Sequence, residues 1–426
     1  MDIIANYADI FIMLSIGFGL FMAWGIGAND VSNAMGTSVG SAAITFKQAV
    51  VIAVIFEFSG AILAGGEVTD TVRKGILDAV LFTNNPHLLV YGMLASLLAA
   101  GAWLLIASSL GWPVSTTHSI VGAIVGFGAV GVGIDAVAWD KVIKIVMSWV
   151  VSPVLAGTLA VFIFKSLQFL VIDTKDPLIN AKRYLPFYVF FVGFIIALVT
   201  QFKGLKHIDS LKYISKNVSL SLIIAIIVGI FAAVIAAFIM RNIKINPKDD
   251  KDFHYANMEK LFAVLMVITA SAMAFAHGSN DVANAIGPLA AVYSIVEAGG
   301  DITSRSAIPS WVLLVGGGGI IFGFVTYGFK VMKTIGQGIT ELTPSRGFAA
   351  ELAAATTVVL ASSTGIPVST TQVLVGAVLG VGIARGVVAL NMRVINTIFL
   401  SWLITLPAGA VMSILFFFAL KGVFGA

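Results

Sequence analysis

Long apolar runs recur along the whole chain and are separated by short polar segments. The runs are roughly 20 residues long, which is the length an α-helix needs to cross a bilayer. They include Ile10–Gly27, Leu88–Leu110, Val142–Phe164, Leu185–Gln201, Ser219–Met240, Leu261–Ala276, Ile308–Phe329 and Val394–Leu420. Many of the charged residues lie between the runs, as in Lys165–Leu185 and Arg241–Lys260. The pattern predicts an all-α protein that crosses a membrane many times.

The composition agrees with a membrane location and excludes several other classes. Hydrophobic residues make up 59% of the 426 residues and charged residues 11%, and the mean hydropathy is +1.02. A soluble chain is about 25% charged. The first apolar run has no basic segment before it, so we expect a true membrane helix rather than a signal peptide. The absence of cysteine excludes disulfides and thiolate metal sites.

The chain contains two copies of the same polar motifs in the same order. Asn29–Gly36 (NDVSNAMG) matches Asn280–Gly287 (NDVANAIG) at six of eight positions. Ala107–Thr117 (ASSLGWPVSTT) matches Ala361–Thr371 (ASSTGIPVSTT) at nine of eleven. The offsets between the copies are 251 and 254 residues. Chance similarity between apolar segments shares Leu, Val and Ala but not Asn-Asp and Ser-Thr-Thr, so the sequence indicates an internal duplication.

The duplication divides the chain into two transmembrane repeats, 1–166 and 258–426, with two extra membrane segments and a polar loop in the linker 167–257. Each repeat has five apolar blocks, so we expect about 10–12 membrane segments. Seven crossings separate the two copies, or five if the third and fourth blocks form a re-entrant hairpin. Either odd number predicts inverted topology with discontinuous helices, as in many secondary transporters. Block 8–46 is too long for one straight span, and the parity changes if it crosses twice.

The repeated Pro-Val-Ser-Thr-Thr element places a helix start inside an apolar region. Proline suits the first turn of a helix, and Ser or Thr caps it. A helix N-terminus carries a partial positive charge and free N–H groups, so it binds anions. Two such elements facing each other would cradle one tetrahedral oxyanion with the hydroxyls of Ser115, Thr116, Thr117, Ser369, Thr370 and Thr371. The alternative is that these hydroxyls only bond back to their helices or hold helices together.

The repeated Asn-Asp motif places a carboxylate in each of two membrane segments, where a charge is costly and indicates function. No Lys or Arg lies in either segment to pair with Asp30 or Asp281. Carboxylate and amide oxygens are hard ligands that suit Na⁺. We therefore expect cations to offset the carboxylates so that an anion can bind beside them, with both aspartates contacting the anion as well. The expected Na⁺ ligands are Asn29, Asp30, Asn33, Asn280, Asp281 and Asn284. The alternative is a structural role for two buried hydrogen-bonded aspartates.

Three further ionisable residues lie in apolar surroundings and occur once each. Glu57 and Glu351 fit a role in an ion pathway and a structural pairing equally well, and His277 directly precedes the second Asn-Asp motif. His118 follows the first Ser-Thr-Thr run, but the second copy has Gln372 at that position. A strict requirement for histidine after the motif is therefore not expected.

At these residues the chain resembles the inorganic phosphate transporter (PiT) family. The duplicated family signature, which contains Gly-x-Asn-Asp-Val-x-Asn-Ala, is carried by Gly27–Ala34 and Gly278–Ala285. Pro113–Thr117 and Pro367–Thr371 match the element that follows it. The resemblance covers both repeats, hence nearly the whole chain. It implies symport of inorganic phosphate with Na⁺ or H⁺ by a protein of inverted repeats.

The resemblance also implies roles in coupling or in the pathway for Glu57, Glu351 and His277. We therefore predict a phosphate symporter, driven by Na⁺ and not an enzyme, in the cell inner (plasma) membrane, with no cofactor besides the transported phosphate and cations. Coupling to H⁺, sulfate as the substrate and, less favoured, an anion channel stay open as alternatives. The expected partners are phosphate, sodium ions and the lipid bilayer. A homodimer is left open, and no nucleic acid is expected.

Overall fold

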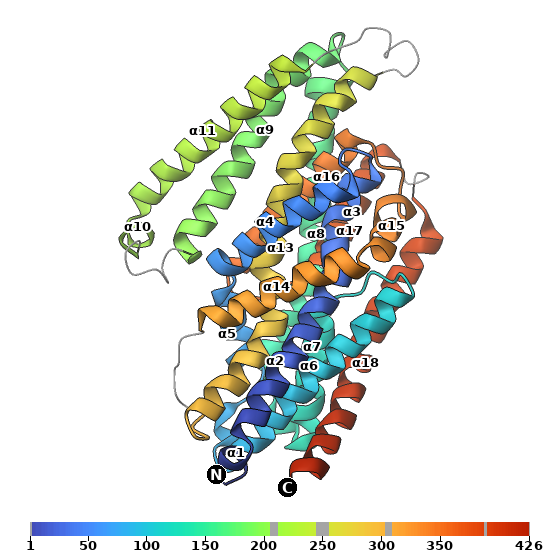
Figure 1. Cartoon of the computed structure of the whole chain (residues 1–426). Helices are drawn as coiled ribbons and strands as arrows, with labels where there is room; N and C mark the ends of the chain where they lie inside the picture. The colour runs from blue at the N-terminus through green and yellow to red at the C-terminus, as the bar shows by residue number, and fades with distance from the viewer. Residues whose placement is uncertain (1, 205–211, 244–254, 303–308, 387–389, 426) are drawn as a thin grey trace.

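The computed structural model describes residues 2–204, 212–243, 255–302, 309–386 and 390–425, apart from the side chains at 2, 33, 67, 73–74, 203–204, 212 and 336–338. Within these residues the chain forms helices, and its only strand-like contact is one bridge between Leu77 and Val137. The all-α prediction is confirmed. Helix α1 (Asp2–Asn6) and the last turns of α18 (Met392–Phe424) lie together at one end of an elongated molecule (Figure 1). We call it the terminal end, and the opposite one the far end.

Nine helices of the described chain are long and apolar enough to cross a membrane. They are α2–α3 (Ala8–Gly40), α4 (Phe46–Ala64), α6 (Pro86–Ser109), α8 with its last turn η4 (Trp139–Ile172), α9 with part of η5 (Pro177–Phe202), α11 (Val218–Asn242), α13 (Ala256–Glu297), α14 (Ser310–Tyr327) and α18. Three further helices complete the core: α7 (Thr116–Gly131), α16 (Pro344–Ser362) and α17 (Thr370–Arg385). The total agrees with the predicted range of segments.

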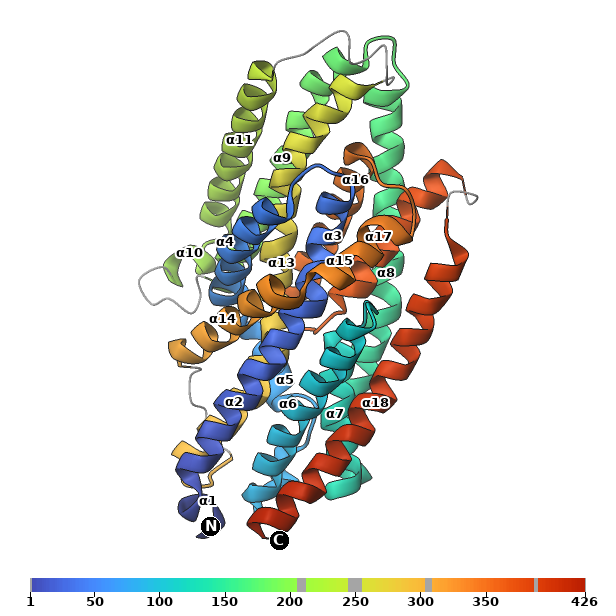
Figure 2. The same cartoon turned by 45° about the vertical axis from the view of Figure 1, so that its right-hand side comes forward.

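Residues 8–40 form one rod and not two crossings. Helix α2 (Ala8–Ile26) passes through the π-helical turn η1 (Gly27–Val31) into α3 (Ser32–Gly40) without reversing direction (Figure 2). Its 33 residues extend about 50 Å at 1.5 Å per residue. This exceeds the roughly 30 Å hydrocarbon core of a bilayer. The long block at 8–46 is therefore a single oversized crossing, and the alternative with two crossings is wrong.

Each repeat contains a helical hairpin that reverses direction near the middle of the molecule. Helices α6 and α7 come from the terminal end, whereas α16 and α17 come from the far end (Figure 2). The tips contain Gly111 and Gly365, with φ values of +69° and +74°. Other residues avoid this left-handed conformation, so glycine is needed to turn the chain here. The third and fourth apolar blocks of each repeat thus form a hairpin, which is the second of the two alternatives predicted from the sequence.

Matching elements of the two repeats run in opposite directions. The α2–α3 rod leads away from the terminal end and α13 leads back to it, and α8 and α18 are related in the same way (Figures 1 and 2). Each hairpin packs on the other repeat, because α7 contacts α18 and α17 contacts α8. Helices α9 and α11 pack mainly on each other at the edge of the molecule. This is the arrangement that inverted repeats produce.

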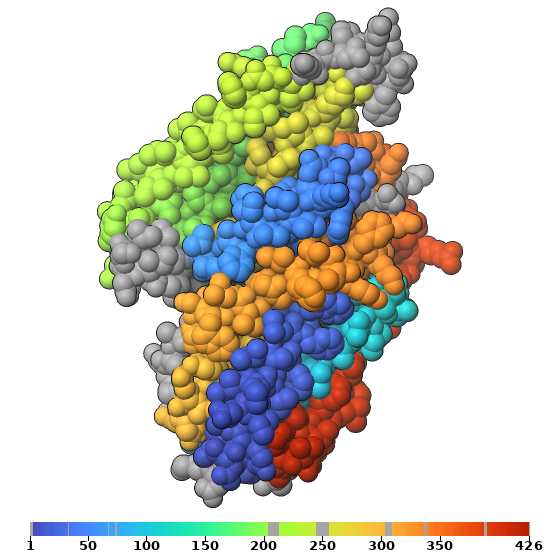
Figure 3. Space-filling view, in the orientation of Figure 1, coloured from blue at the N-terminus to red at the C-terminus, as the bar shows by residue number. Residues whose placement is uncertain are grey.

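The glycine that opens each signature lets another helix approach closely. A Cβ atom on Gly27 would lie 1.7 Å from the carbonyl oxygen of Ile320 in α14, and one on Gly278 would lie 2.1 Å from that of Glu57 in α4. No side chain fits at such distances. Helices α4 and α14, which lie side by side across one face in Figure 3, are thereby pressed against the two Asn-Asp segments. The signature glycines therefore serve the packing around the site.

Candidate functional site

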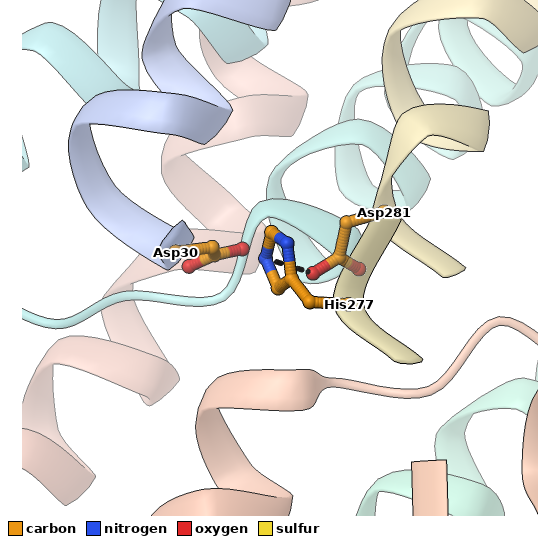
Figure 4. A group of neighbouring side chains, drawn as sticks. All are labelled: Asp30, His277 and Asp281. Carbon is orange, nitrogen blue, oxygen red and sulfur yellow. Dashed lines mark ion pairs between the residues drawn. The ribbon is translucent and has the colours of Figure 1, made fainter. Parts of the chain in front are cut away.

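The two Asn-Asp segments and the two hairpin tips meet near the middle of the molecule. Asp30 and Asp281 are buried there, in η1 and in the uninterrupted helix α13. Short π-helical turns such as η1 are frequent at functional sites. The two carboxylates lie on either side of His277, and one ligand atom from each of the three side chains lies within 4.8 Å of the others (Figure 4). Groups at this spacing could hold a cation.

Asn29 and Asn280 each hold one hairpin tip, and the bonds that they accept come from equivalent positions of the two copies. The side-chain oxygen of Asn29 accepts a hydrogen bond from the backbone N–H of Val114 (3.1 Å), and that of Asn280 accepts one from Val368 (3.4 Å). Their amides donate to tip carbonyls, Asn29 to Trp112 (3.0 Å) and Asn280 to Val368 (2.8 Å). Non-helical backbone at membrane depth needs such partners. The asparagines therefore support the tips here, and their ligation of Na⁺ stays a prediction.

The two tips are joined to each other by a reciprocal pair of hydrogen bonds. The hydroxyl of Thr117 donates to the carbonyl oxygen of Val368, and that of Thr371 donates to Val114, both at 3.1 Å. Donors and acceptors are equivalent positions of the two copies. The two Pro-Val-Ser-Thr-Thr elements therefore face each other and are in direct contact, which is the arrangement that the cradle hypothesis needs.

Threonine hydroxyls of the tips also donate to the buried carboxylates. Thr116 donates to Oδ2 of Asp30, and Thr370 donates to Oδ2 of Asp281, each at 2.5 Å. Thr371 donates to Oδ1 of Asp30 at 2.9 Å. Short O–H···O distances are typical of bonds to an ionised acceptor. These bonds hold the first turns of α7 and α17 against the two aspartates.

Ser115 and Ser369 begin the two inner helices. Each is the N-cap residue, and its hydroxyl oxygen accepts a hydrogen bond of 3.2 Å from the backbone N–H three residues later, at His118 and Gln372. The predicted helix starts are confirmed. The partially positive N-termini of both helices thus lie beside the carboxylates. Binding of phosphate by the six tip hydroxyls stays a prediction.

His277 connects Asp281 to Glu57. Its Nδ1 atom lies 2.8 Å from Oε2 of Glu57, and its Nε2 atom lies 2.8 Å from Oδ2 of Asp281. All three side chains are buried. The Nδ1 contact has hydrogen-bond geometry, whereas the Nε2 contact is close enough for an ion pair but does not have hydrogen-bond geometry. The basic partner of Asp281 is therefore a histidine one helical turn earlier, which a search for lysine and arginine misses.

Asn284 adds a buried oxygen to the centre. Its amide donates to the hydroxyls of Thr116 and Thr117 at 3.2 Å each and lies 3.5 Å from Oδ1 of Asp281. Its side-chain oxygen has no hydrogen-bond partner among the described residues. A buried, unpaired oxygen is available as a cation ligand. The side chain of Asn33, the equivalent residue of the first copy, lies outside the described part of the chain.

Glu351 lies on α16, apart from this centre. Its carboxylate is buried and accepts hydrogen bonds from the hydroxyls of Thr37 (2.6 Å) and Ser38 in α3 and of Thr269 (2.6 Å) in α13. Glu57 and Glu351 thus have separate partners and do not pair. Sequence reasoning selected both glutamates but missed the three hydroxyls. Their only signal was their position in the membrane segments that carry the Asn-Asp motifs.

Comparison with known proteins assigns the chain to a family. Residues 26–413 match the phosphate transporter family. A Haemophilus influenzae protein named as a phosphate permease is 52% identical over 424 residues, which cover 100% of both chains. This chain belongs to the phosphate transporter family. The resemblance noted in the sequence is thereby confirmed, and the transporter is a multi-pass membrane protein whose substrate is phosphate.

Further relatives of the transporter cover nearly all of it. A Pyrococcus furiosus protein, also named as a phosphate permease, is 44% identical over 99% of both chains. A chloroplastic inorganic phosphate transporter of Arabidopsis thaliana is 42% identical over 94% of this chain and 70% of its own. A solved structure described as the sodium-dependent phosphate transporter has a TM-score of 0.88 at 40% identity, covering 97% of this chain and 100% of the other.

Proposed function

We propose that the transporter couples the movement of inorganic phosphate to Na⁺ at the centre formed by Asp30, His277 and Asp281. The observation that carries the proposal is the convergence of two buried carboxylates and two helix N-termini on one small space. Helix N-termini and hydroxyls suit an anion, and carboxylates suit a cation. A centre with both kinds of group is suited to bind both ions together.

Charge balance gives the reason for coupling. Asp30, Asp281 and Glu57 are three buried carboxyl groups around the single imidazole of His277. When the carboxyl groups are ionised, one imidazole cannot neutralise them. A phosphate anion brought next to this centre is repelled until cations neutralise the excess. Na⁺ binding would therefore precede or accompany phosphate binding.

The threonine hydroxyls can make the two binding events depend on each other. Thr116, Thr370 and Thr371 donate to the aspartates. A cation on the carboxylate oxygens would compete with these bonds, and a released hydroxyl can turn to donate to phosphate. In this scheme the hydroxyls of both tips bind phosphate, and Asp30 and Asp281 accept the proton that phosphate carries.

Na⁺ is the coupling ion that the site supports best. Its ligands would be hard oxygens, including the unpaired oxygen of Asn284, and the solved relative is described as sodium-dependent. Coupling to H⁺ is a second candidate, because the nitrogens of His277 each lie 2.8 Å from a carboxylate and can carry a proton between them. A plasma-membrane location and a homodimer stay predictions, and the chloroplastic relative shows that the family occurs in other membranes.

Uptake of radiolabelled phosphate into proteoliposomes under imposed gradients separates these candidates. We expect an inward Na⁺ gradient to drive accumulation above equilibrium, and choline in place of Na⁺ to abolish it. Accumulation in choline under an inward H⁺ gradient would support H⁺ coupling and overturn the Na⁺ version. Phosphate that only equilibrates under either gradient would indicate a channel and overturn symport.

A further inference from the structure

A polar cavity lies between the far-end segments of four helices, α8, α13, α16 and α17. Its volume is about 310 Å³, and its polar lining includes Glu259, Ser345, Arg346 and Arg385. Arg385 is the last residue of α17, whereas Thr370, which contacts Asp281, is the first. At 1.5 Å per residue these ends are about 22 Å apart along the helix. The cavity is therefore separate from the central site.

Two guanidinium groups converge on one neutral oxygen beside this cavity. The Nη1 atom of Arg346 lies 3.1 Å from the backbone oxygen of Glu341, and Nη1 of Arg385 lies 3.2 Å from the same oxygen. Arg385 also donates from Nη1 to the hydroxyl of Thr340, at 3.4 Å. Among the described residues, these hydrogen bonds use only Nη1 of each arginine. The remaining N–H donors of two close, like charges are left for another acceptor.

Glu259 and Glu341 lie near Arg346 and partly offset its charge, but neither carboxylate hydrogen-bonds to either guanidinium group among the described residues. Both oxygens of Glu259 are taken by Ser345, one by its backbone N–H and one by its hydroxyl, at 2.7 Å each. The side chain of Glu341 is 87% exposed and lies 3.9 Å from Arg346, and such a surface pair contributes little. Arg385 has no carboxylate within 4.0 Å in the part of the chain that the structure describes.

We propose that Arg346 and Arg385 form a second anion site, which binds a phosphate group at the far end of the transporter. Guanidinium groups match phosphate oxygens with parallel N–H donors, and the adjacent N-terminus of α16 adds a partial positive charge. A volume of about 310 Å³ is many times what a single water needs, so a phosphate and its first waters fit. The phosphate belongs either to free inorganic phosphate or to an anionic lipid, since both present the same oxygens.

The two arginines of the site occur only in the second repeat. With the hairpin offset of 254 residues, Arg346 corresponds to Gly92 and Arg385 to Gly131. Phosphate would therefore be held at one end of the molecule only, at the base of the hairpin whose tip lies at the central site. The proposal does not depend on which cation the transporter uses.

Equilibrium binding of radiolabelled inorganic phosphate to the purified, full-length transporter in Na⁺-free choline buffer tests the site. We expect binding that survives Asp30→Asn and weakens roughly tenfold or more in Arg346→Gln and in Arg385→Gln. Arg393→Gln is the matched control, because Arg393 is exposed on α18 and does not line the cavity. It should bind phosphate as the wild type does. Unchanged thermal stability verifies that the variants fold.

A second arm identifies the source of the phosphate group. The transporter is placed in nanodiscs of phosphatidylglycerol or phosphatidylcholine, and lipid retained through purification is identified by native mass spectrometry. A lipid occupant predicts that wild type and Arg393→Gln retain phosphatidylglycerol and that Arg385→Gln loses it. The proposal is overturned if neither phosphate binding nor lipid retention differs between the wild type and the two cavity variants. Na⁺-driven uptake by the wild type is measured separately, so failure here is distinct from failure of the coupling scheme.

Discussion

Asp30 and Asp281 occupy equivalent positions of the two repeats but have different surroundings. Asp30 accepts a hydrogen bond from the hydroxyl of Thr371, which lies in the hairpin tip of the other repeat. Asp281 instead contacts His277 on its own helix. With the motif offset of 251 residues, the position of His277 corresponds to Ile26 in the first copy. The histidine contact therefore follows from a difference in sequence between the two copies, and the local helix geometry also differs, because Asp30 lies in the π-helical turn η1 and Asp281 in the uninterrupted helix α13.

The contacts that the aspartates share come from the duplication, and the contacts that differ come from residues present once. The matched threonine bonds and the asparagine supports build a symmetric frame. His277 and Glu57 add charge to one side of that frame. Asp30 lies on the other side of the same imidazole and accepts hydrogen bonds from Thr116 and Thr371, so we expect a cation site there to depend less on the proton of His277. Asp281 is the better candidate for one that senses protons.

A second asymmetry separates the two sides of the centre. Towards the far end, the carboxylate of Glu351 is surrounded by three hydroxyls. At the equivalent positions towards the terminal end, the chain has only apolar residues. The pairs are Glu351 and Leu97, Thr37 and Pro288, Ser38 and Leu289, and Thr269 and Phe18. Polar groups thus continue from the centre towards the far end, along the hairpin that also carries the proposed arginine site.

Neutralising either aspartate should have the largest effect. Asp30→Asn and Asp281→Asn each remove a coupling charge, so we expect Na⁺-driven phosphate uptake to fall on the order of 100-fold. Asp281→Asn should also remove the dependence of Na⁺ affinity on pH. In Asp30→Asn, the residual transport should still depend on pH. Ser96→Ala is the control, since Ser96 is buried and, among the residues that the structure describes, bonds only within α6 and to Ser413. Normal uptake by Asp30→Asn would contradict the proposed cation site.

Replacing His277 tests the asymmetry of the two aspartates directly. In the wild type, a proton gained by the imidazole adds positive charge beside Asp281, so Na⁺ affinity should decrease as the pH falls. His277→Gln keeps a donor at this position without titrating, so its Na⁺ affinity should be flat, and uptake should fall roughly tenfold. The measurement is the apparent Na⁺ affinity of both proteins from pH 5.5 to 8. Parallel curves would eliminate the role of the imidazole.

Local chemistry explains what could be predicted from the sequence. The helix starts at Ser115 and Ser369 follow from proline and a hydroxyl at fixed spacing, and the buried aspartates follow from charges in apolar runs. The partners could not be predicted, because they are distant along the chain. His277 and Glu57 are 220 residues apart, and Thr371 and Asp30 are 341 apart. For Asn29, the motif indicated an ion ligand, whereas the folded tip uses its amide.

The contrast between the two sides of the centre can be tested at Glu351. Glu351→Gln keeps the size of the side chain but removes its charge. The amide nitrogen replaces one of the two carboxylate oxygens, so the three surrounding hydroxyls lose one of their two acceptor atoms. We expect uptake to fall about five- to tenfold, because the bonds lost are charge-assisted. The control is the equivalent position, Leu97→Met, a volume-conserving change that should stay within about twofold of wild type. Equal losses of uptake in Glu351→Gln and Leu97→Met would mean that the polar groups around Glu351 have no special role in transport.

The smallest effects should come from the two threonines that join the tips. Thr117→Val and Thr371→Val each remove one hydroxyl from the cradle and one of the reciprocal bonds, worth about 0.5–1.5 kcal/mol. Both should therefore lower thermal stability and phosphate affinity to a similar degree, about two- to fivefold in affinity. Only the hydroxyl of Thr371 also contacts Asp30. Only Thr371→Val should therefore raise the Na⁺ affinity, because valine removes a hydrogen-bond donor that competes with the cation for that carboxylate. Equal Na⁺ affinities in the two variants, measured by uptake across a Na⁺ titration, would show that the bond between Thr371 and Asp30 has no functional consequence.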